Sequence, residues 1–315
     1  MTRFDLAITL DYELVTPADF VLMIQPARTP YQRVTWERLH VEPAVETREE
    51  AHGSPATRHL RLRAEPGTLR IRYEAIVDLV HHFAVPETVE EVPVARLPAA
   101  VLPYVYPSRY CPSDRMMEIA HREFGGMAQG YGRLEAIRSW VESHVRFQPG
   151  ASHAGTSALE TYQCRAGVCR DYAHLMITLC RALNIPARLA TGIDYGADPA
   201  LGPPDFHCYV EAYLNERWYL FDPSGISPGM GLIRIGTGRD AADVAFATLF
   251  GTVRGSMPRI EIRADDDARE GVVPPFRHDY AVSTDAGAGG DVENDELPVA
   301  LFAQARSVCA APRWR

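Results

Sequence analysis

The sequence contains no hydrophobic run that approaches the roughly 18 residues a membrane-spanning helix needs. It also lacks the uninterrupted apolar region of a secretory signal peptide, because Asp5 and Asp11 interrupt the amino terminus. We therefore expect a protein without membrane contacts, located in the cytoplasm.

Positive charge is scarce: 32 Lys and Arg face 41 Asp and Glu, for a net charge of -9. This balance argues against nucleic-acid binding, which needs a basic excess. Much of the imbalance is local, since residues 265–296 carry ten acidic and two basic residues. That segment is also rich in glycine and poor in apolar residues, so residues 264–315 are predicted to be an acidic, largely disordered tail whose partner is unknown.

Cysteine is sparse as well, with six in 315 residues. In a chain of this size and expected location, so few cysteines indicate thiols rather than a disulfide framework. Each therefore needs its own explanation. They are Cys111, Cys164, Cys169, Cys180, Cys208 and Cys309.

The amino-terminal part of the chain does show the alternation of apolar and polar residues that is typical of β-strands. Apolar residues alternate strictly from Phe4 to Tyr12 and again from Leu69 to Leu79, which is typical of half-buried strands. Residues 1–83 are thus predicted to form an all-β, sandwich-like domain, and prolines mark residues 84–110 as a linker. Four arginines occupy the outer strand faces, where a solvated surface is favoured over a bound polyanion. They are Arg61, Arg63, Arg70 and Arg72.

Helical periodicity then takes over, which predicts an α+β core over residues 111–263. Its main feature is a helix from Cys169 to about Leu183 with almost no polar face, so this helix is expected to be central and buried. It should stop at Asn184-Ile-Pro, because proline disfavours helical geometry in the preceding residue. Strands follow it.

Cys169 opens the predicted helix just after a glycine. Unpaired backbone amides and the helix dipole favour an anion at this position, so they stabilise a thiolate and lower the thiol pKa. Cys169 is therefore a candidate nucleophile.

A thiol nucleophile needs a base and a group that orients the base. His207 lies on the polar side of the strand Phe206–Leu214, and a second strand runs from Trp218 to Asp222. If the turn between them has an even number of residues, Asp222 becomes a diagonal neighbour of His207 on one face. The hairpin register thus predicts a His207–Asp222 pair.

Zinc binding is the main alternative for this group of cysteines and histidines. Cys208 and His207 alternate faces of one strand, however, and are poorly placed to bind the same ion. We expect no metal and no cofactor. Glu211 shares the His207 face and is interpreted as a structural partner of Arg188 rather than as a catalytic group.

These segments together resemble the transglutaminase-like core. The matching motifs cover about residues 110–225: Gly167-Val-Cys169-Arg-Asp, Asn184-Ile-Pro-Ala-Arg188, His207-Cys-Tyr-Val-Glu211 and Trp218-Tyr-Leu-Phe-Asp222-Pro. The β domain resembles the amino-terminal module of bacterial members, and Arg239–Gly251 resembles the end of that subgroup.

The resemblance implies a papain-like α+β fold, with the nucleophile helix packed on an antiparallel sheet. It also implies that Cys169 attacks an amide carbonyl, that His207 acts as base and then acid, and that Asp222 orients His207. An oxyanion hole would use the Cys169 backbone N–H and, by the same resemblance, Gln163. One departure is Tyr209, which stands where the family motif more often has tryptophan.

The leading hypothesis is a cysteine-dependent enzyme that forms a thioacyl intermediate from a peptide or protein amide. Water as acceptor would make it a peptidase, amidase or deamidase, and an amine would make it a cross-linking enzyme. We favour hydrolysis. The alternative is a catalytically silent interaction module in which the β domain binds a partner.

Overall fold

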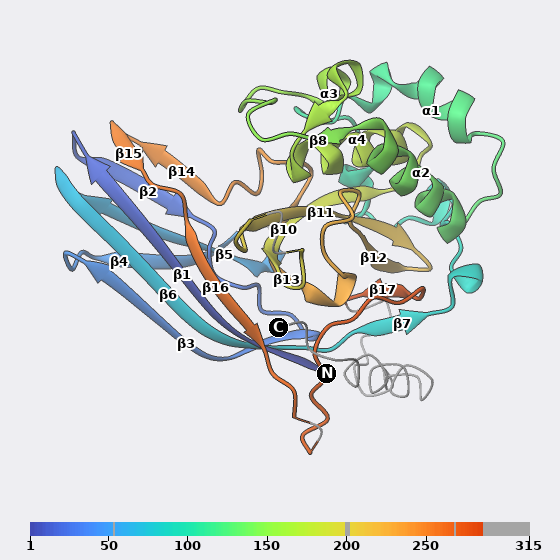
Figure 1. Ribbon diagram of the computed structural model, residues 1–315. Helices are drawn as coiled ribbons and strands as arrows, with labels where there is room; N and C mark the ends of the chain where they lie inside the picture. The colour runs from blue at the N-terminus through green and yellow to red at the C-terminus, as the bar shows by residue number, and fades with distance from the viewer. Residues whose placement is uncertain (53, 199–201, 268, 286–315) are drawn as a thin grey trace.

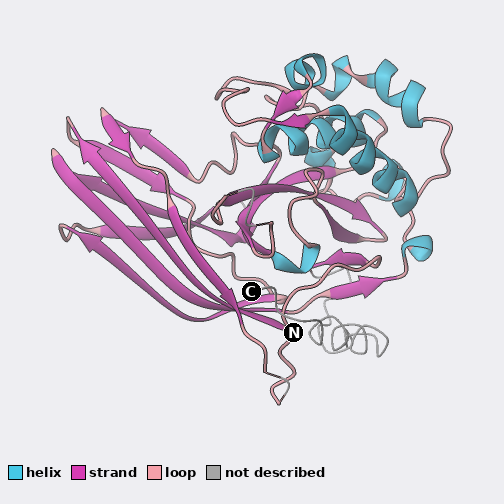
Figure 2. Ribbon diagram, viewed as in Figure 1, coloured by secondary structure: helices cyan, strands magenta, loops and turns pink. Residues whose placement is uncertain are grey.

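The alternating residues of the amino-terminal segment build two antiparallel sheets that together form a sandwich (Figures 1 and 2). The computed structural model describes residues 1–52, 54–198, 202–267 and 269–285. One sheet has the order β15-β1-β6-β3, with β16 also paired to β1, and the other has the order β14-β2-β5-β4. The strands are β1 (Thr2–Leu14), β2 (Ala18–Leu22), β3 (Gln32–Glu42), β4 (Thr47–His52), β5 (Ser54–Ala64), β6 (Gly67–Leu79), β14 (Ala247–Phe250), β15 (Val253–Gly255) and β16 (Arg259–Ala264).

The apolar positions of these strands point into the sandwich, as the periodicity predicts. Phe4 and Ile8 of β1 are fully buried, and so is Leu22 of β2. Tyr12 contacts Phe20 edge-on across the two sheets, with ring centroids 5.2 Å apart. The prediction of an amino-terminal all-β domain is confirmed.

Three strands of this domain come from the far end of the chain. Residues 247–263 are predicted to belong to the core, but β14 pairs with β2, and β15 and β16 pair with β1. Short strands far apart in sequence leave no local signal of their partner, so periodicity alone could not place them. The amino-terminal domain is therefore completed by carboxy-terminal strands (Figure 1).

The remainder of the described chain forms the predicted α+β core. Helices cover one face of the antiparallel sheet β12-β11-β10-β13, and α4 packs on β10 and β11 (Figure 2). A short parallel pair, β8 with β9, lies just before α4. The elements are α1 (Met117–Phe124), α2 (Tyr131–His144), β8 (Arg146–Phe147), α3 (Ala158–Cys164), β9 (Ala166–Gly167), α4 (Cys169–Ala182), β10 (Ala187–Asp194), β11 (Phe206–Leu214), β12 (Arg217–Phe221) and β13 (Leu232–Gly238).

Helix α4 is the central element of the core, as its lack of a polar face predicts. Every residue from Asp171 to Ala182 is buried. The helix ends before Asn184, whose φ of 64° is left-handed. Ile185 and Pro186 then lead into β10, so the predicted stop at Asn184-Ile-Pro is confirmed.

The opposite face of the core sheet is covered by a strap formed by β7 (His82–Ala84) and β17 (Ala281–Ser283). Val282 packs with Tyr209 and Leu220 of the sheet. This corrects the prediction of a disordered tail for residues 264–285, because the high average charge of the segment hides a short buried strand. The rest of the predicted tail, residues 286–315, lies outside the described residues.

Gln32 fastens the two domains to each other. Its side-chain amide is 1% exposed and donates to the carbonyl oxygens of Ala27 and Arg234, both at 2.7 Å. Its Oε1 atom accepts the backbone N–H of Arg234 at 2.8 Å. Because a buried amide that satisfies both of its polar ends is costly to remove, this contact stabilises the junction of β3 with β13.

In the part of the chain that the structure describes, no helix combines the length and apolar character required to cross a bilayer.

Candidate active site

Cys169 lies at the first position of α4, where the sequence predicts it. The preceding loop is fixed by Asp171, whose buried carboxylate accepts the Val168 N–H at 2.9 Å and the Ser152 hydroxyl at 2.5 Å. A Cβ atom on Gly167 would lie 2.6 Å from Cβ of Asp171, so only glycine fits there. These contacts hold the Cys169 sulfur at the helix amino terminus, half-buried and reduced.

The hairpin that carries the other two candidate residues has the predicted register. Leu214 pairs with Arg217, which leaves a two-residue turn at Asn215 and Glu216. Both turn residues have positive φ, 44° and 59°, which is the geometry of the tight turns that join antiparallel strands. An even-length turn is therefore confirmed.

This register brings His207 and Asp222 together. The Nε2 atom of His207 lies 3.2 Å from Oδ1 of Asp222, and both side chains are buried. Asp222 follows the last residue of β12 and is held by the loop after it. Its carboxylate accepts the Ser224 backbone N–H at 3.0 Å, the Ser224 hydroxyl at 2.6 Å and the Ser227 N–H at 3.1 Å.

The environment keeps this carboxylate ionised. Burial acts to raise the pKa of Asp222, but the charge and hydrogen bond of His207 and the donors from Ser224 and Ser227 outweigh it and lower the pKa to about 2. Burial likewise acts to lower the pKa of His207. Asp222 and the Cys169 thiolate outweigh that effect, so the His207 pKa is raised well above its ordinary value.

The Cys169 thiol has its pKa lowered well below the ordinary value. The first cause is a hydrogen bond from the Cys208 thiol, which acts together with the hydrogen bond and positive charge of His207 against the opposing effect of burial. The Cys208 backbone also contributes a hydrogen bond, and the Cys208 pKa is raised in return. The pKa values of Cys169, His207 and Asp222 are thus shifted in the directions that favour a thiolate, an imidazolium and a carboxylate.

Cys208 is not predicted as a site residue, because strand alternation places it on the face opposite His207. Near the beginning of β11 both residues nevertheless lower the pKa of Cys169. The sequence feature that could have identified Cys208 is its position directly after His207, the proposed base.

Gln163 lies exposed in the last turn of α3. Among the described residues no hydrogen bond links its amide to Cys169, so its oxyanion role stays a prediction from the resemblance.

Glu211 and Tyr209 are structural. Glu211 is fully buried and accepts the Arg188 Nε–H at 2.7 Å, as predicted, while Arg234 binds its other oxygen. The Arg188 guanidinium also lies 4.1 Å from the ring centre of Trp218. Tyr209 is 0% exposed within the sheet, so the departure from tryptophan at this position changes the core and not a surface open to substrate.

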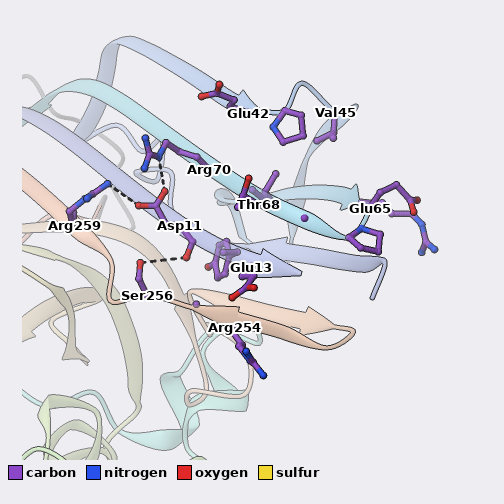
Figure 3. Close-up of a pocket in the computed structure, with 17 residues that line it drawn as sticks. Asp11, Glu13, Glu42, Val45, Glu65, Thr68, Arg70, Arg254, Ser256 and Arg259 are labelled. Carbon is purple, nitrogen blue, oxygen red and sulfur yellow. Dashed lines mark hydrogen bonds and ion pairs between the residues drawn. The ribbon is translucent and has the colours of Figure 1, made fainter. Parts of the chain in front are cut away.

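The outer arginines of the β domain are matched by acids. Figure 3 shows Asp11 between Arg70 and Arg259, at 2.6 and 2.8 Å, in a hollow at one end of the sandwich. The other three arginines also have acidic neighbours: Arg61 with Glu50, Arg63 with Asp19 and Arg72 with Glu74. This pairing favours the solvated charged face over a polyanion site.

No group of three His, Cys, Asp or Glu side chains among the described residues is arranged to hold a metal ion.

Comparison with known proteins identifies the fold and the family. Residues 118–223 match the model of the transglutaminase-like superfamily, and residues 2–100 match the amino-terminal domain of bacterial transglutaminase. A crystal structure from Cytophaga hutchinsonii, provisionally described as a cysteine protease, is 37% identical and superposes with a TM-score of 0.83. The match covers 90% of this chain and 97% of that one.

Curated relatives are more distant. An uncharacterized protein of Mycobacterium leprae is 28% identical over 145 residues, which are 44% of this chain and 51% of the relative. An uncharacterized protein of Mycobacterium tuberculosis is 28% identical over 122 residues, 35% of this chain and 39% of the relative. The chain thus spans about half or less of the curated relatives it matches.

The fold and the matched models define a papain-like α+β core preceded by a β domain. The chain belongs to the transglutaminase-like superfamily.

Proposed function

We propose that the protein is a cysteine-dependent acyl-transfer enzyme that acts on amide bonds of peptides or proteins. The observation that carries this proposal is the buried His207–Asp222 pair at 3.2 Å, together with a lowered pKa of the Cys169 thiol and a raised pKa of the His207 imidazole. Such a thiolate–imidazolium pair supplies both a nucleophile and a proton donor at neutral pH.

The reaction would run in two halves. The Cys169 thiolate attacks the amide carbonyl carbon, and the Cys169 backbone N–H donates to the developing oxyanion, with Gln163 as the candidate second donor. His207 gives its proton to the leaving amine as the C–N bond breaks, which leaves a thioester on Cys169. Neutral His207 then takes a proton from the incoming acceptor, and Asp222 holds the ring in position.

Hydrolysis is the outcome we propose, with water as the acceptor. The Cytophaga hutchinsonii structure described as a cysteine protease supports this choice, because it matches 90% of this chain. Transfer to an amine uses the same three residues and differs only in the acceptor that reaches the thioester.

The first experiment is iodoacetamide labelling of the full chain across pH. Cys169 should label with a midpoint well below the ordinary thiol value of about 8.5. His207→Ala should move that midpoint upward, because the positive partner is lost. The exposed Cys164 serves as the internal reference. Equal labelling profiles for Cys164 and Cys169 would favour the catalytically silent module.

The second experiment identifies the acceptor. A library of peptide amides is incubated with and without a primary amine, and the products are analysed by mass spectrometry, with Cys169→Ala as the control. Free acids alone would support hydrolysis, and amine adducts would support cross-linking. Product formation that survives Cys169→Ala would refute the proposed mechanism.

A further inference from the structure

Two aromatic rings stack where β11 begins, directly before the proposed base His207, and the fold leaves both partly exposed. Phe206 is the first residue of β11 and directly precedes His207, and its ring lies parallel to that of Phe246. The ring centroids are 4.7 Å apart and the planes differ by 15°. Phe246 is 38% exposed and Phe206 is half-buried, so the pair presents an apolar surface to solvent.

The two rings come from different domains. Phe206 belongs to the core sheet, whereas Phe246 precedes β14, and its carbonyl accepts the backbone N–H of Met23 at 2.9 Å. The pair therefore lies where the β domain meets the core. This hydrogen bond fixes the backbone of Phe246 independently of its side chain.

The position of Phe206 on β11 places the pair beside the proposed site. Phe206 shares its strand face with Cys208, and both pack against the core cluster that contains α4, the helix that begins at Cys169. The next residue after Phe206, His207, lies 3.2 Å from Asp222. The lowered pKa of Cys169, to which Cys208 contributes, agrees with this placement. Because a strand advances about 3.3 Å per residue, Phe206 lies roughly 7 Å along the backbone from Cys208.

That spacing matches one or two residues of an extended peptide. A scissile carbonyl must approach the sulfur to about 3–3.5 Å before reaction, and an extended chain covers about 3.3–3.6 Å per residue. A side chain close to the scissile amide would therefore meet the two rings. Burying an apolar side chain on them is favourable, whereas a polar side chain would lose water contacts there without gaining hydrogen bonds.

We propose that Phe206 and Phe246 form a substrate subsite that selects an apolar or aromatic side chain within two residues of the scissile amide. The inference rests on the proposed function, since it assumes that Cys169 is the nucleophile. It adds a specificity determinant to that function and assigns the β domain a part in substrate selection through Phe246.

The test uses peptidyl chloromethyl ketones, which alkylate a reactive cysteine and need no turnover. In each of two reagent pairs, the members differ only in carrying phenylalanine or serine, at the residue that bears the ketone in one pair and at the residue before it in the other. In at least one pair, the phenylalanine reagent should inactivate the wild-type full chain at least about tenfold faster than the serine reagent. Phe246→Ala should cut that preference several-fold, while Phe246→Leu should retain most of it. Iodoacetamide labelling of Cys169 should stay unchanged in both variants.

Phe250→Ala is the matched control, because Phe250 is 60% exposed on β14 and belongs to the same returning segment. It should leave the preference intact. The inference is overturned if wild type shows no preference for phenylalanine in either pair, or if Phe246→Ala slows both members of a pair equally. Failure of the proposed function can be distinguished from failure of the subsite. In that case Cys169 would react with the reagents, yet the wild type would release no product from any amide.

Discussion

At Cys169, the two neighbouring residues His207 and Cys208 both lower the pKa of the thiol. His207 supplies a positive charge, which its pairing with Asp222 sustains, and Cys208 supplies a thiol and a backbone N–H. The thiolate of the proposed nucleophile is thus favoured by the strand beside it as well as by the start of its own helix.

Removal of the Cys208 thiol should make Cys169 less acidic. Cys208→Ala is expected to move the midpoint of iodoacetamide labelling at Cys169 upward by about half to one pH unit, the effect of one neutral hydrogen bond. Cys208→Ser should restore most of the shift, because the hydroxyl can donate in the same place. Cys164→Ala is the control, and an unchanged midpoint in Cys208→Ala would show that the thiol contact has no influence.

The charge of Asp222 should set the alkaline limit of activity. The proposed enzyme gains activity as Cys169 loses its proton and loses activity as His207 loses the proton that the leaving group needs. Because the His207 pKa is raised by Asp222, Asp222→Asn should move the alkaline limb of kcat/KM to lower pH and reduce its plateau by at least tenfold. A pH profile of kcat/KM measures both effects. An alkaline limb that does not move would show that Asp222 does not raise the pKa of His207.

At the scale of single elements, the strap β17 is attached to the core sheet through buried charge. Asp285, two residues after the strand, binds Arg188 and lies 3.6 Å from Arg234. These arginines already share Glu211, so the carboxylate of Asp285 supplies a second negative charge to two buried cations. The strap is thus held by charge matching in addition to its strand pairing with β7.

Loss of Asp285 should therefore destabilise the fold. Asp285→Ala is expected to lower the free energy of unfolding by about 1–3 kcal/mol, because it leaves the arginine pair with one carboxylate. Urea denaturation followed by tryptophan fluorescence measures the change. Asp279→Ala, an exposed acid on the same segment, should alter stability by less than about 0.5 kcal/mol. Equal effects of the two variants would contradict a special role for Asp285.

The predictable elements are those whose signal is local. The uniform apolar character of Cys169–Leu183 identified α4, and the lengths of two strands and their turn predicted the pairing of His207 with Asp222. Cys208 could not be assigned, since its role depends on how the end of β11 meets α4. The Arg188–Asp285 contact was equally inaccessible, because it joins residues 97 positions apart.

At the scale of the whole molecule, the two domains share a continuous interior. One cluster of buried side chains includes Ile8 of β1, Leu175 of α4 and Ile235 of β13. Gln32 makes three buried hydrogen bonds, two of which cross the junction to the backbone of Arg234. The matched family models divide the chain into two modules, but its packing joins them into one body.

Unfolding should consequently occur in a single transition. Far-ultraviolet circular dichroism and tryptophan fluorescence should report the same urea midpoint. Gln32→Ala should lower that midpoint by an amount corresponding to about 1–3 kcal/mol, because the backbone groups of Arg234 lose their partner. Thr35→Ala, at an exposed site on the same strand, is the control. Two separate midpoints in the wild type would show that the domains unfold independently.

The return of β14–β16 to the amino-terminal sheets affects how the protein is made. A ribosome releases β1 and β2 early, but the strands that cover their open edges end at Ala264 and emerge only after the helices and the sheet of the core. At about 5–20 residues per second, those edges wait tens of seconds without their partners. Unpaired edges invite association with other chains, so nascent copies should depend on chaperones during that interval. The domain whose synthesis begins first therefore cannot close until the sheet of the second domain has been made.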